Sequence, residues 1–161
     1  MILAINTSTF QFGIALMKED KTVLAEFSVS KRKGHFGSLL PALHSLLTTT
    51  KSDIHDLEAL VVATGPGSFT GLRVGLSTAK GLCHALEVPI IGISSLKALA
   101  CQMPYPTCPI TPILDSRKGE FFAAKFTWSK GHNLIRNLED TCLRLEEFPS
   151  VFKEPTLFIG N

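Results

Sequence analysis

A glycine-bearing turn lies between a short apolar run and a long helical pattern, and it constrains the fold more than any other stretch of the chain. The apolar run at 59–63 is typical of a buried strand, and the turn at 64–69 follows it directly. Gly65 and Gly67 permit backbone angles and close approaches that side chains forbid. Ser68 can cap the helix that follows. The sequence therefore predicts a strand, a glycine turn and a helix in succession.

This turn has the residues to direct backbone N–H groups at an anion. It lacks the Gly-Lys-Ser/Thr ending of a P-loop, and its spacing is not that of the dinucleotide-binding fingerprint. Two common nucleotide-binding loops are therefore excluded.

The predicted helix at 68–87 has a narrow polar stripe and two apolar flanks, whereas a surface helix needs only one apolar stripe. It must therefore be buried on two sides. Small residues recur at Gly71, Gly75 and Ala79, a spacing that lets another backbone approach closely. Two interpretations remain open, packing within the chain and a subunit interface. The first flank is Leu72, Gly75, Leu76, Ala79, Cys83 and Leu86, and the second is Gly71, Val74, Thr78, Leu82 and Ala85.

The order of the predicted elements gives the fold class. Three strands come first, then a helix with apolar period, and then strand, long helix, strand and a short helix capped by Ser94 or Ser95. This βββ-α-β-α-β-α order predicts an α/β fold with a ribonuclease-H-like lobe. The elements before the capped helix are expected at 2–5, 13–17, 23–29, 36–47, 59–63, 68–87 and 88–93.

A proline-rich stretch divides the chain. Three prolines between 103 and 109 favour an extended connector. We therefore expect an N-terminal lobe at 1–102, a linker at 103–109 and an incomplete second lobe at 110–161. Strand patterns in the second lobe are expected at 112–115, 121–128, 134–138 and 156–159.

Composition limits the class of protein. The chain has 161 residues, of which 45% are apolar, so a substantial core is available. A net charge of +2 gives no strong nucleic-acid footprint. No apolar run is long enough for a bilayer, and no signal peptide is evident, so we expect a cytoplasmic chain. The four cysteines form no C-x-x-C pair and the five histidines show no metal-binding spacing, so we expect free thiols and no metal.

Several motifs together resemble one family. The stretch Gly-Pro-Gly-Ser-Phe-Thr-Gly-Leu-Arg-Val-Gly-Leu at 65–76 closely resembles the signature of the TsaB family, also called YeaZ. The opening strand and turn at 1–9 and the start of the first helix at 32–41 are similar to the family as well. The segments at 92–100 and 115–121 follow in the expected order.

The resemblance implies half of the sugar-kinase/Hsp70/actin (ASKHA) architecture, with a second, smaller α/β lobe that we expect to be truncated. It also implies a non-catalytic subunit that supports TsaD in forming threonylcarbamoyladenosine in tRNA. TsaD would carry the metal and the chemistry, and a TsaE-type ATPase would dock on the TsaB–TsaD pair. The chain would contact tRNA only indirectly and would form a homodimer when alone.

The resemblance places the partner interface on the first helix and the long helix, and the two apolar flanks of the long helix support this. We expect no catalytic residue, no cofactor and no membrane contact. The predicted interface residues are Leu39, Leu43, Leu46, Gly67, Gly71, Leu72, Arg73, Gly75, Leu76 and Ala79.

Two enzyme hypotheses are alternatives. In kinases of this architecture, an acidic residue in the first hairpin turn organises metal and nucleotide. Here Asn6, Thr7, Ser8 and Thr9 occupy the turn, and Asn6 cannot supply the carboxylate that Mg²⁺ favours. The turn is therefore either a vestigial anion or nucleotide site or simply a polar hairpin turn. A small nucleotide-binding kinase or ATPase is the first alternative. A peptidase is the second, although no Gly-x-Ser-x-Gly elbow is present.

Overall fold

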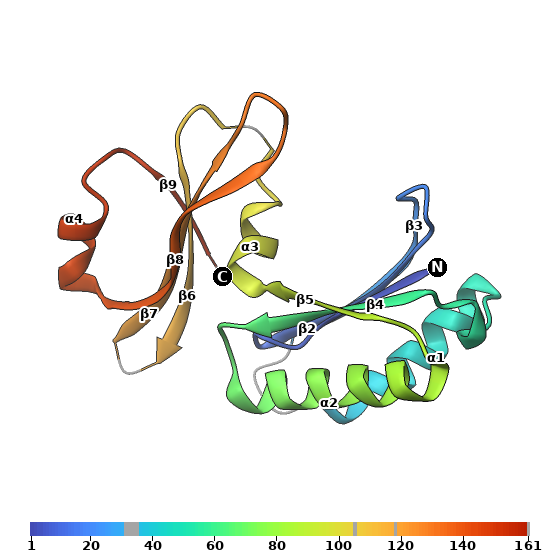
Figure 1. The fold of residues 1–161 in the computed structure, drawn as a ribbon. Coiled ribbons are helices and arrows are strands. Elements are labelled where there is room, and N and C mark those ends of the chain that lie inside the picture. The colour runs from blue at the N-terminus through green and yellow to red at the C-terminus, as the bar shows by residue number, and fades with distance from the viewer. Residues whose placement is uncertain (31–35, 105, 118, 161) are drawn as a thin grey trace. The chain divides into compact units, whose positions relative to one another are not determined.

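A computed structural model describes residues 1–30, 36–104, 106–117 and 119–160 (Figure 1). Contacts along the chain define two compact units, Met1–Ile93 and Ser94–Asn161, which we call the first and second lobes. Each lobe is built on its own sheet. The chain is therefore an α/β protein with two sheets, each in its own lobe.

The sheet of the first lobe has the strand order β3-β2-β1-β4-β5. Strands β1 and β2 are antiparallel, as are β2 and β3, whereas β4 runs parallel to β1. This arrangement is the one expected for a ribonuclease-H-like lobe and confirms the predicted fold class. The strands are β1 (Ile2–Asn6), β2 (Gln11–Met17), β3 (Val23–Ser30), β4 (Ala59–Gly65) and β5 (Ile90–Ser94).

Two helices, α1 (Leu39–Thr50) and α2 (Phe69–Leu86), lie on the same side of this sheet (Figure 1). Helix α2 packs on β4 and β1, and α1 packs on β2 and β3. Alternate residues of the strands face these helices, because side chains along a strand point to opposite faces in turn. Leu3 and Ile5 of β1 are buried in this way.

Local signals set the ends of these helices. Pro41 lies in the first turn of α1, where its missing N–H costs no helical hydrogen bond. The predicted cap of α2 is confirmed, because the Ser68 hydroxyl accepts a hydrogen bond from the Gly71 N–H at 3.3 Å. Between α1 and β4 lies a short 3-10 helix, η2 (Ile54–Asp56), capped by Asp53. Another 3-10 turn, η1 (Phe36–Ser38), leads into α1.

The sheet of the second lobe has the order β8-β7-β6-β9. Strands β6, β7 and β8 form an antiparallel meander, and β9 returns parallel to β6. Its buried core includes Leu114, Ala124 and Phe126. The elements are α3 (Ser95–Ala100), β6 (Ile110–Arg117), β7 (Glu120–Trp128), β8 (Leu134–Arg144), η3 (Leu145–Glu147), α4 (Phe148–Val151) and β9 (Leu157–Gly160).

The division between the lobes differs from the predicted one at 102, because α3 belongs to the second lobe. Leu96 and Ala100 are fully buried and share a core cluster with Ile110 and Phe126. The short helix therefore covers the second sheet, and the chain divides after Ile93.

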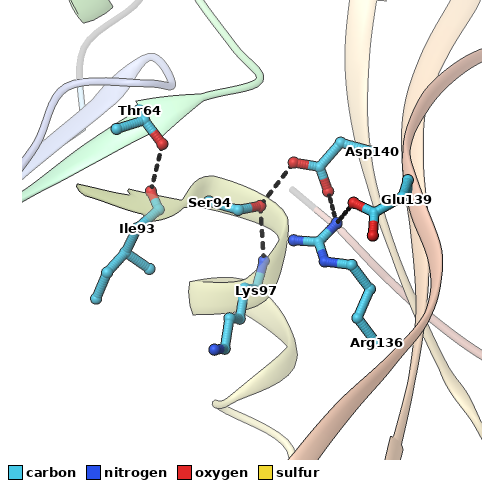
Figure 2. Close-up of polar contacts among 7 residues, drawn as sticks. All are labelled: Thr64, Ile93, Ser94, Lys97, Arg136, Glu139 and Asp140. Carbon is cyan, nitrogen blue, oxygen red and sulfur yellow. Dashed lines mark hydrogen bonds and ion pairs between the residues drawn. The ribbon is translucent and has the colours of Figure 1, made fainter.

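Ser94 is the residue that caps α3. Its hydroxyl accepts a hydrogen bond from the Lys97 N–H at 3.2 Å and donates one to Asp140 at 2.8 Å. Asp140 also pairs with Arg136 of β8 (Figure 2). The cap therefore ties α3 to β8 within the second lobe.

Helix α4 has no counterpart among the predicted elements. It has four residues, too few to show a helical period, and it contains Pro149 near its start. It covers its sheet through aromatic contacts, because Phe148 lies within 6 Å, between ring centroids, of three other phenylalanines. These are Phe121 at 5.9 Å, Phe152 at 5.4 Å and Phe158 at 5.9 Å.

Among the residues that the structure describes, none of the helices combines the length and the apolar character needed to cross a bilayer. The basic run at 31–33 and His35 lie outside the described residues.

Candidate functional site

The turn between β1 and β2 is held by hydrogen bonds inside the chain. Thr7 and Ser8 are each 1% exposed. The Thr7 hydroxyl donates to the Gly71 carbonyl of α2 at 2.7 Å. The Asn6 carboxamide oxygen accepts from both the N–H and the hydroxyl of Ser8, at 3.0 and 2.7 Å, and Thr9 bonds to Gln11. All four polar side chains of the predicted anion or nucleotide site are therefore engaged within the chain.

The glycine turn before α2 lies directly against this hairpin turn. The Ser68 N–H donates to the Ser8 carbonyl at 2.6 Å. A Cβ atom at Gly67 would lie 2.1 Å from that same carbonyl oxygen, so only glycine fits. Gly65 and Gly67 have φ values of 110° and 155°, in the region that favours glycine. The glycines of the signature therefore serve a close backbone contact within the first lobe.

Six of the predicted interface residues are buried in the core of the first lobe. Leu43 is one of the six. On α2 the cause is close packing: a Cβ at Gly75 would lie 2.2 Å from the Thr7 hydroxyl oxygen. On α1 the side chains fill the core under the sheet. The six are Leu39, Leu43, Leu46, Gly71, Gly75 and Ala79.

The other four predicted interface residues reach the surface to different degrees. Arg73 is exposed, and Gly67, Leu72 and Leu76 are half-buried. The Arg73 guanidinium lies 5.0 Å from the ring centroid of Phe69, which is 72% exposed. This pairing leaves an aromatic ring and a cation together near the start of α2.

A groove along α1 is the feature that sequence reasoning missed. It has a volume of about 520 Å³ and is lined by α1, the segment that leads to η2, and Leu82 of α2. Leu40, on its rim, is 58% exposed. The apolar part of the lining is Leu40, Leu43, Leu47, Ile54 and Leu82. We call this the α1–α2 groove.

Gly81 precedes Leu82 on α2 and is exposed. A Cβ at this position would meet nothing within 4 Å, unlike the Cβ at Gly75. Leu82 of the second flank lines the groove, and it is the sequence signal that would have found this side of the helix. Gly71, Gly75 and Ala79 are buried against the sheet.

The acidic residues of the second lobe stabilise a hairpin. The Asp115 carboxylate accepts from the Arg117 N–H at 2.7 Å, and Glu120 lies 4.0 Å from Arg144. These contacts give both carboxylates structural roles at the β6–β7 turn. Among the described residues, no group of three or more His, Cys, Asp or Glu side chains could hold a metal ion.

Ser8 and Ser68, two hydroxyls that a peptidase could use as nucleophile, have structural contacts. The Ser8 hydroxyl donates to Asn6, and the Ser68 hydroxyl caps α2. Buried Cys83 is held as a thiol, because burial raises its pKa.

Comparisons with known proteins identify the family. The family model for TsaD, tRNA N6-adenosine threonylcarbamoyltransferase, matches residues 22–151. The tRNA threonylcarbamoyladenosine biosynthesis protein TsaB of Bacillus subtilis is 39% identical over 99% of this chain and 70% of its own length. The protein of the same name from Escherichia coli is 39% identical over 87% of this chain and 60% of its own length. The chain thus spans less than two thirds of the second relative.

Solved structures agree with this relationship. YeaZ from Pseudomonas aeruginosa superimposes with a TM-score of 0.78 at 25% identity, over 90% of this chain and 67% of that one. A structure described as an uncharacterized protein with similarity to peptidase YEAZ, from the same species, has a TM-score of 0.82 at 21% identity. It covers 99% of this chain and 82% of that chain, and it supports the fold. The chain belongs to the TsaB (YeaZ) family.

Proposed function

We propose that this chain is a non-catalytic subunit in tRNA threonylcarbamoyladenosine biosynthesis, and that it binds a TsaD-type subunit through the α1–α2 groove. The observation that carries the proposal is the pairing of this open apolar groove with exposed Gly81 on the adjoining helix. The names of the curated relatives give the pathway.

Gly81 has no packing role within the described chain. Glycine in the middle of an exposed helix costs roughly 1 kcal/mol relative to alanine. At Gly75 the contact with Thr7 explains that cost, but at Gly81 a Cβ would reach open space. Close approach of a partner helix would explain why the helix has glycine at position 81 despite that cost, as the contact with Thr7 does at Gly75.

Apolar side chains at the α1–α2 groove would contribute to binding. Leu40 is exposed on the rim and Leu82 lines the groove. Burial of such side chains favours association, because apolar surface is removed from water. Phe69 and Arg73 extend the same helix toward its start, where a cation–aromatic pair suits the edge of an interface.

The non-catalytic part of the proposal rests on the β1–β2 turn. Asn6 stands where kinases of this architecture have a carboxylate, and its oxygen is occupied by Ser8. The purified chain should therefore not hydrolyse ATP. A magnesium-dependent ATPase rate that persists through purification and is lost in Thr7→Ala would favour the kinase or ATPase alternative.

The other predicted partners are a second copy of the chain, a TsaE-type ATPase and, indirectly, tRNA. Without TsaD, two copies should pair through the α1–α2 groove, because an exposed apolar surface seeks a partner. A TsaE-type ATPase would bind the TsaB–TsaD pair, and tRNA would be contacted through TsaD. A strictly monomeric chain at high concentration, by light scattering, would count against the dimer.

The central test is Gly81→Leu, with Gly81→Ala as its matched control. Both substitutions enter open space, so both variants should fold, and circular dichroism checks this. A leucine should hold the partner helix away and weaken binding of TsaD from the same organism at least a hundredfold in calorimetry. Alanine adds one methyl group and should cost much less. Full binding by folded Gly81→Leu would place the interface elsewhere.

A charge substitution tests the edge of the interface. Arg73→Glu should weaken TsaD binding only several-fold, and the loss should shrink as salt rises, because rim charges act through screened electrostatics. A loss that is independent of salt would move Arg73 from the rim into the buried centre of the interface.

A further inference from the structure

Thr7 lies in the turn that sequence analysis associated with anion binding, but its hydroxyl points at a helix. The oxygen donates to the Gly71 carbonyl of α2 at 2.7 Å, and this bond joins residues 64 positions apart. The side chain is 1% exposed. Its donor is therefore committed to the backbone of α2.

Gly75 makes this contact sterically possible. A Cβ at that position would lie 2.2 Å from the Thr7 hydroxyl oxygen, 3.4 Å from its Cβ and 3.5 Å from its methyl group. The hydroxyl thus occupies the space that a side chain at residue 75 would need. Thr7 and Gly75 are complementary in size, and Gly71 supplies the acceptor one helical turn away.

A second contact fixes the same end of the helix. The Ser68 N–H bonds to the Ser8 carbonyl at 2.6 Å, immediately before α2 begins. The β1–β2 turn therefore contacts α2 at its N-cap, through Ser68, and in its first two turns, where Thr7 meets Gly71 and Gly75. Neither contact depends on a ligand.

We infer that Thr7 and Gly75 form a clamp that sets the position of α2 on its sheet, and that Thr7 is a positioning residue rather than a ligand-binding one. A helix moves as a rigid element, so a clamp near its start also positions Gly81 and Leu82 farther along. The consequence for TsaD binding rests on the proposed function, whereas the clamp itself does not.

Two Thr7 variants separate the hydrogen bond from the shape. Thr7→Val keeps the volume and removes the donor, while Thr7→Ser keeps the donor. In Thr7→Val, the backbone amides of α2 between 71 and 75 should exchange hydrogen about fivefold faster, the factor expected for one neutral hydrogen bond. Thr7→Ser should retain most of the protection. Equal exchange in Thr7→Val and the unchanged chain would overturn the clamp.

A double substitution tests the complementarity even if one single variant fails to fold. Gly75→Ala alone should lower the denaturation midpoint, because its methyl group meets the hydroxyl. Thr7→Ala removes that oxygen and leaves the Cβ contact at 3.4 Å, which is an ordinary distance. The double variant Thr7→Ala/Gly75→Ala should therefore have a higher midpoint than Gly75→Ala. Additive losses, or a double variant less stable than both, would overturn the inference.

TsaD binding then tests the functional half. Folded Thr7→Val should bind TsaD about fivefold more weakly, since binding must also order a loosened helix, and Thr7→Ser should restore affinity. Unchanged affinity with faster exchange would overturn the link to binding and leave the clamp in place. Gly81→Leu, which does not touch the clamp, reports separately on the interface.

Discussion

The two lobes arrange their first four strands alike, but the turn after the first strand is buried in the first lobe and exposed in the second. In both, three antiparallel strands are followed by a strand that returns parallel to the first. The β1–β2 turn of the first lobe is buried, with Thr7 bonded to α2. In the β6–β7 turn of the second lobe, Gly119 is exposed and has no neighbour within 4 Å of a Cβ position.

This difference shows what the glycine signature contributes to the fold. Gly67 and Gly75 allow α2 to approach the β1–β2 turn more closely than any side chain would permit. In the second lobe, the Asp115 carboxylate accepts a local hydrogen bond from the Arg117 N–H at the β6–β7 turn. The β1–β2 turn is therefore bonded to a helix 64 positions along the chain, whereas this contact at the β6–β7 turn spans two residues.

The lobes also differ in what covers the sheet between the third and fourth strands. The first lobe uses the 12-residue helix α1, whereas the second uses the four-residue helix α4. Four phenylalanine rings around α4 supply the apolar contact that its length cannot. Helix length and aromatic packing are thus two solutions for the same position.

The largest expected effect comes from Gly75→Leu. Its side chain has no space beside Thr7, so we expect a loss of about 5 kcal/mol, at the upper end for a single substitution. Amide protection in β1 and β4 should disappear in hydrogen exchange. A folded Gly75→Leu chain would show that the small residues of α2 do not set the packing of the first lobe.

Phe126→Ala is the corresponding destabilising substitution in the second lobe. The ring is fully buried, so we expect a loss of about 4 kcal/mol. Trp128 is the only tryptophan, so its fluorescence during urea unfolding reports on this lobe. Phe158→Ala is the control, since this ring is partly exposed and should cost about 1 kcal/mol. Equal losses would mean that the two aromatic sites are equally important.

Gly119→Ala should have a small effect, which sharpens the contrast between the turns. The position has φ 77°, but a methyl group would meet nothing. Only backbone strain remains, and we expect about 1 kcal/mol by Trp128 fluorescence. A loss as large as that of Gly75→Leu would show that the β6–β7 turn has a packed role after all.

Thiol labelling should distinguish the lobes without changing either. Burial raises the pKa of Cys83 in the first lobe, so less of the reactive thiolate forms near pH 8. Cys101 and Cys142 of the second lobe are exposed. Mass spectrometry after brief treatment with a maleimide should find these two modified first. Early modification of Cys83 would indicate local opening of the first lobe.

Local signals were sufficient to predict most of the fold. Alternating apolar residues marked the strands, and the cap at Ser68 marked the start of α2. The order of elements was enough for the ribonuclease-H-like lobe. Helix α4 was not predicted, because four residues show no helical period. The structural division after Ile93 differs from the predicted boundary, because α3 packs onto strands that follow it in sequence.

The site was harder to predict, because α2 has small residues on two neighbouring flanks. Periodicity indicates that both flanks are apolar, but not which of them faces the sheet. The deciding contact joins Thr7 to Gly71 across 64 positions. No local pattern encodes a hydroxyl that fills the space above Gly75. The groove that the structure shows shares Leu43 with the predicted interface and reaches α2 at Leu82, which the prediction did not include.

The fit between Thr7 and Gly75 has a consequence for how sequences of this family change. A larger residue at position 75 becomes acceptable only after position 7 has lost its hydroxyl, so the order of the two substitutions matters. Taken in the opposite order, the intermediate chain is unstable and is removed by selection. Among relatives, we therefore expect alanine at the position of Gly75 mainly where alanine or glycine replaces Thr7, so that the two positions vary together.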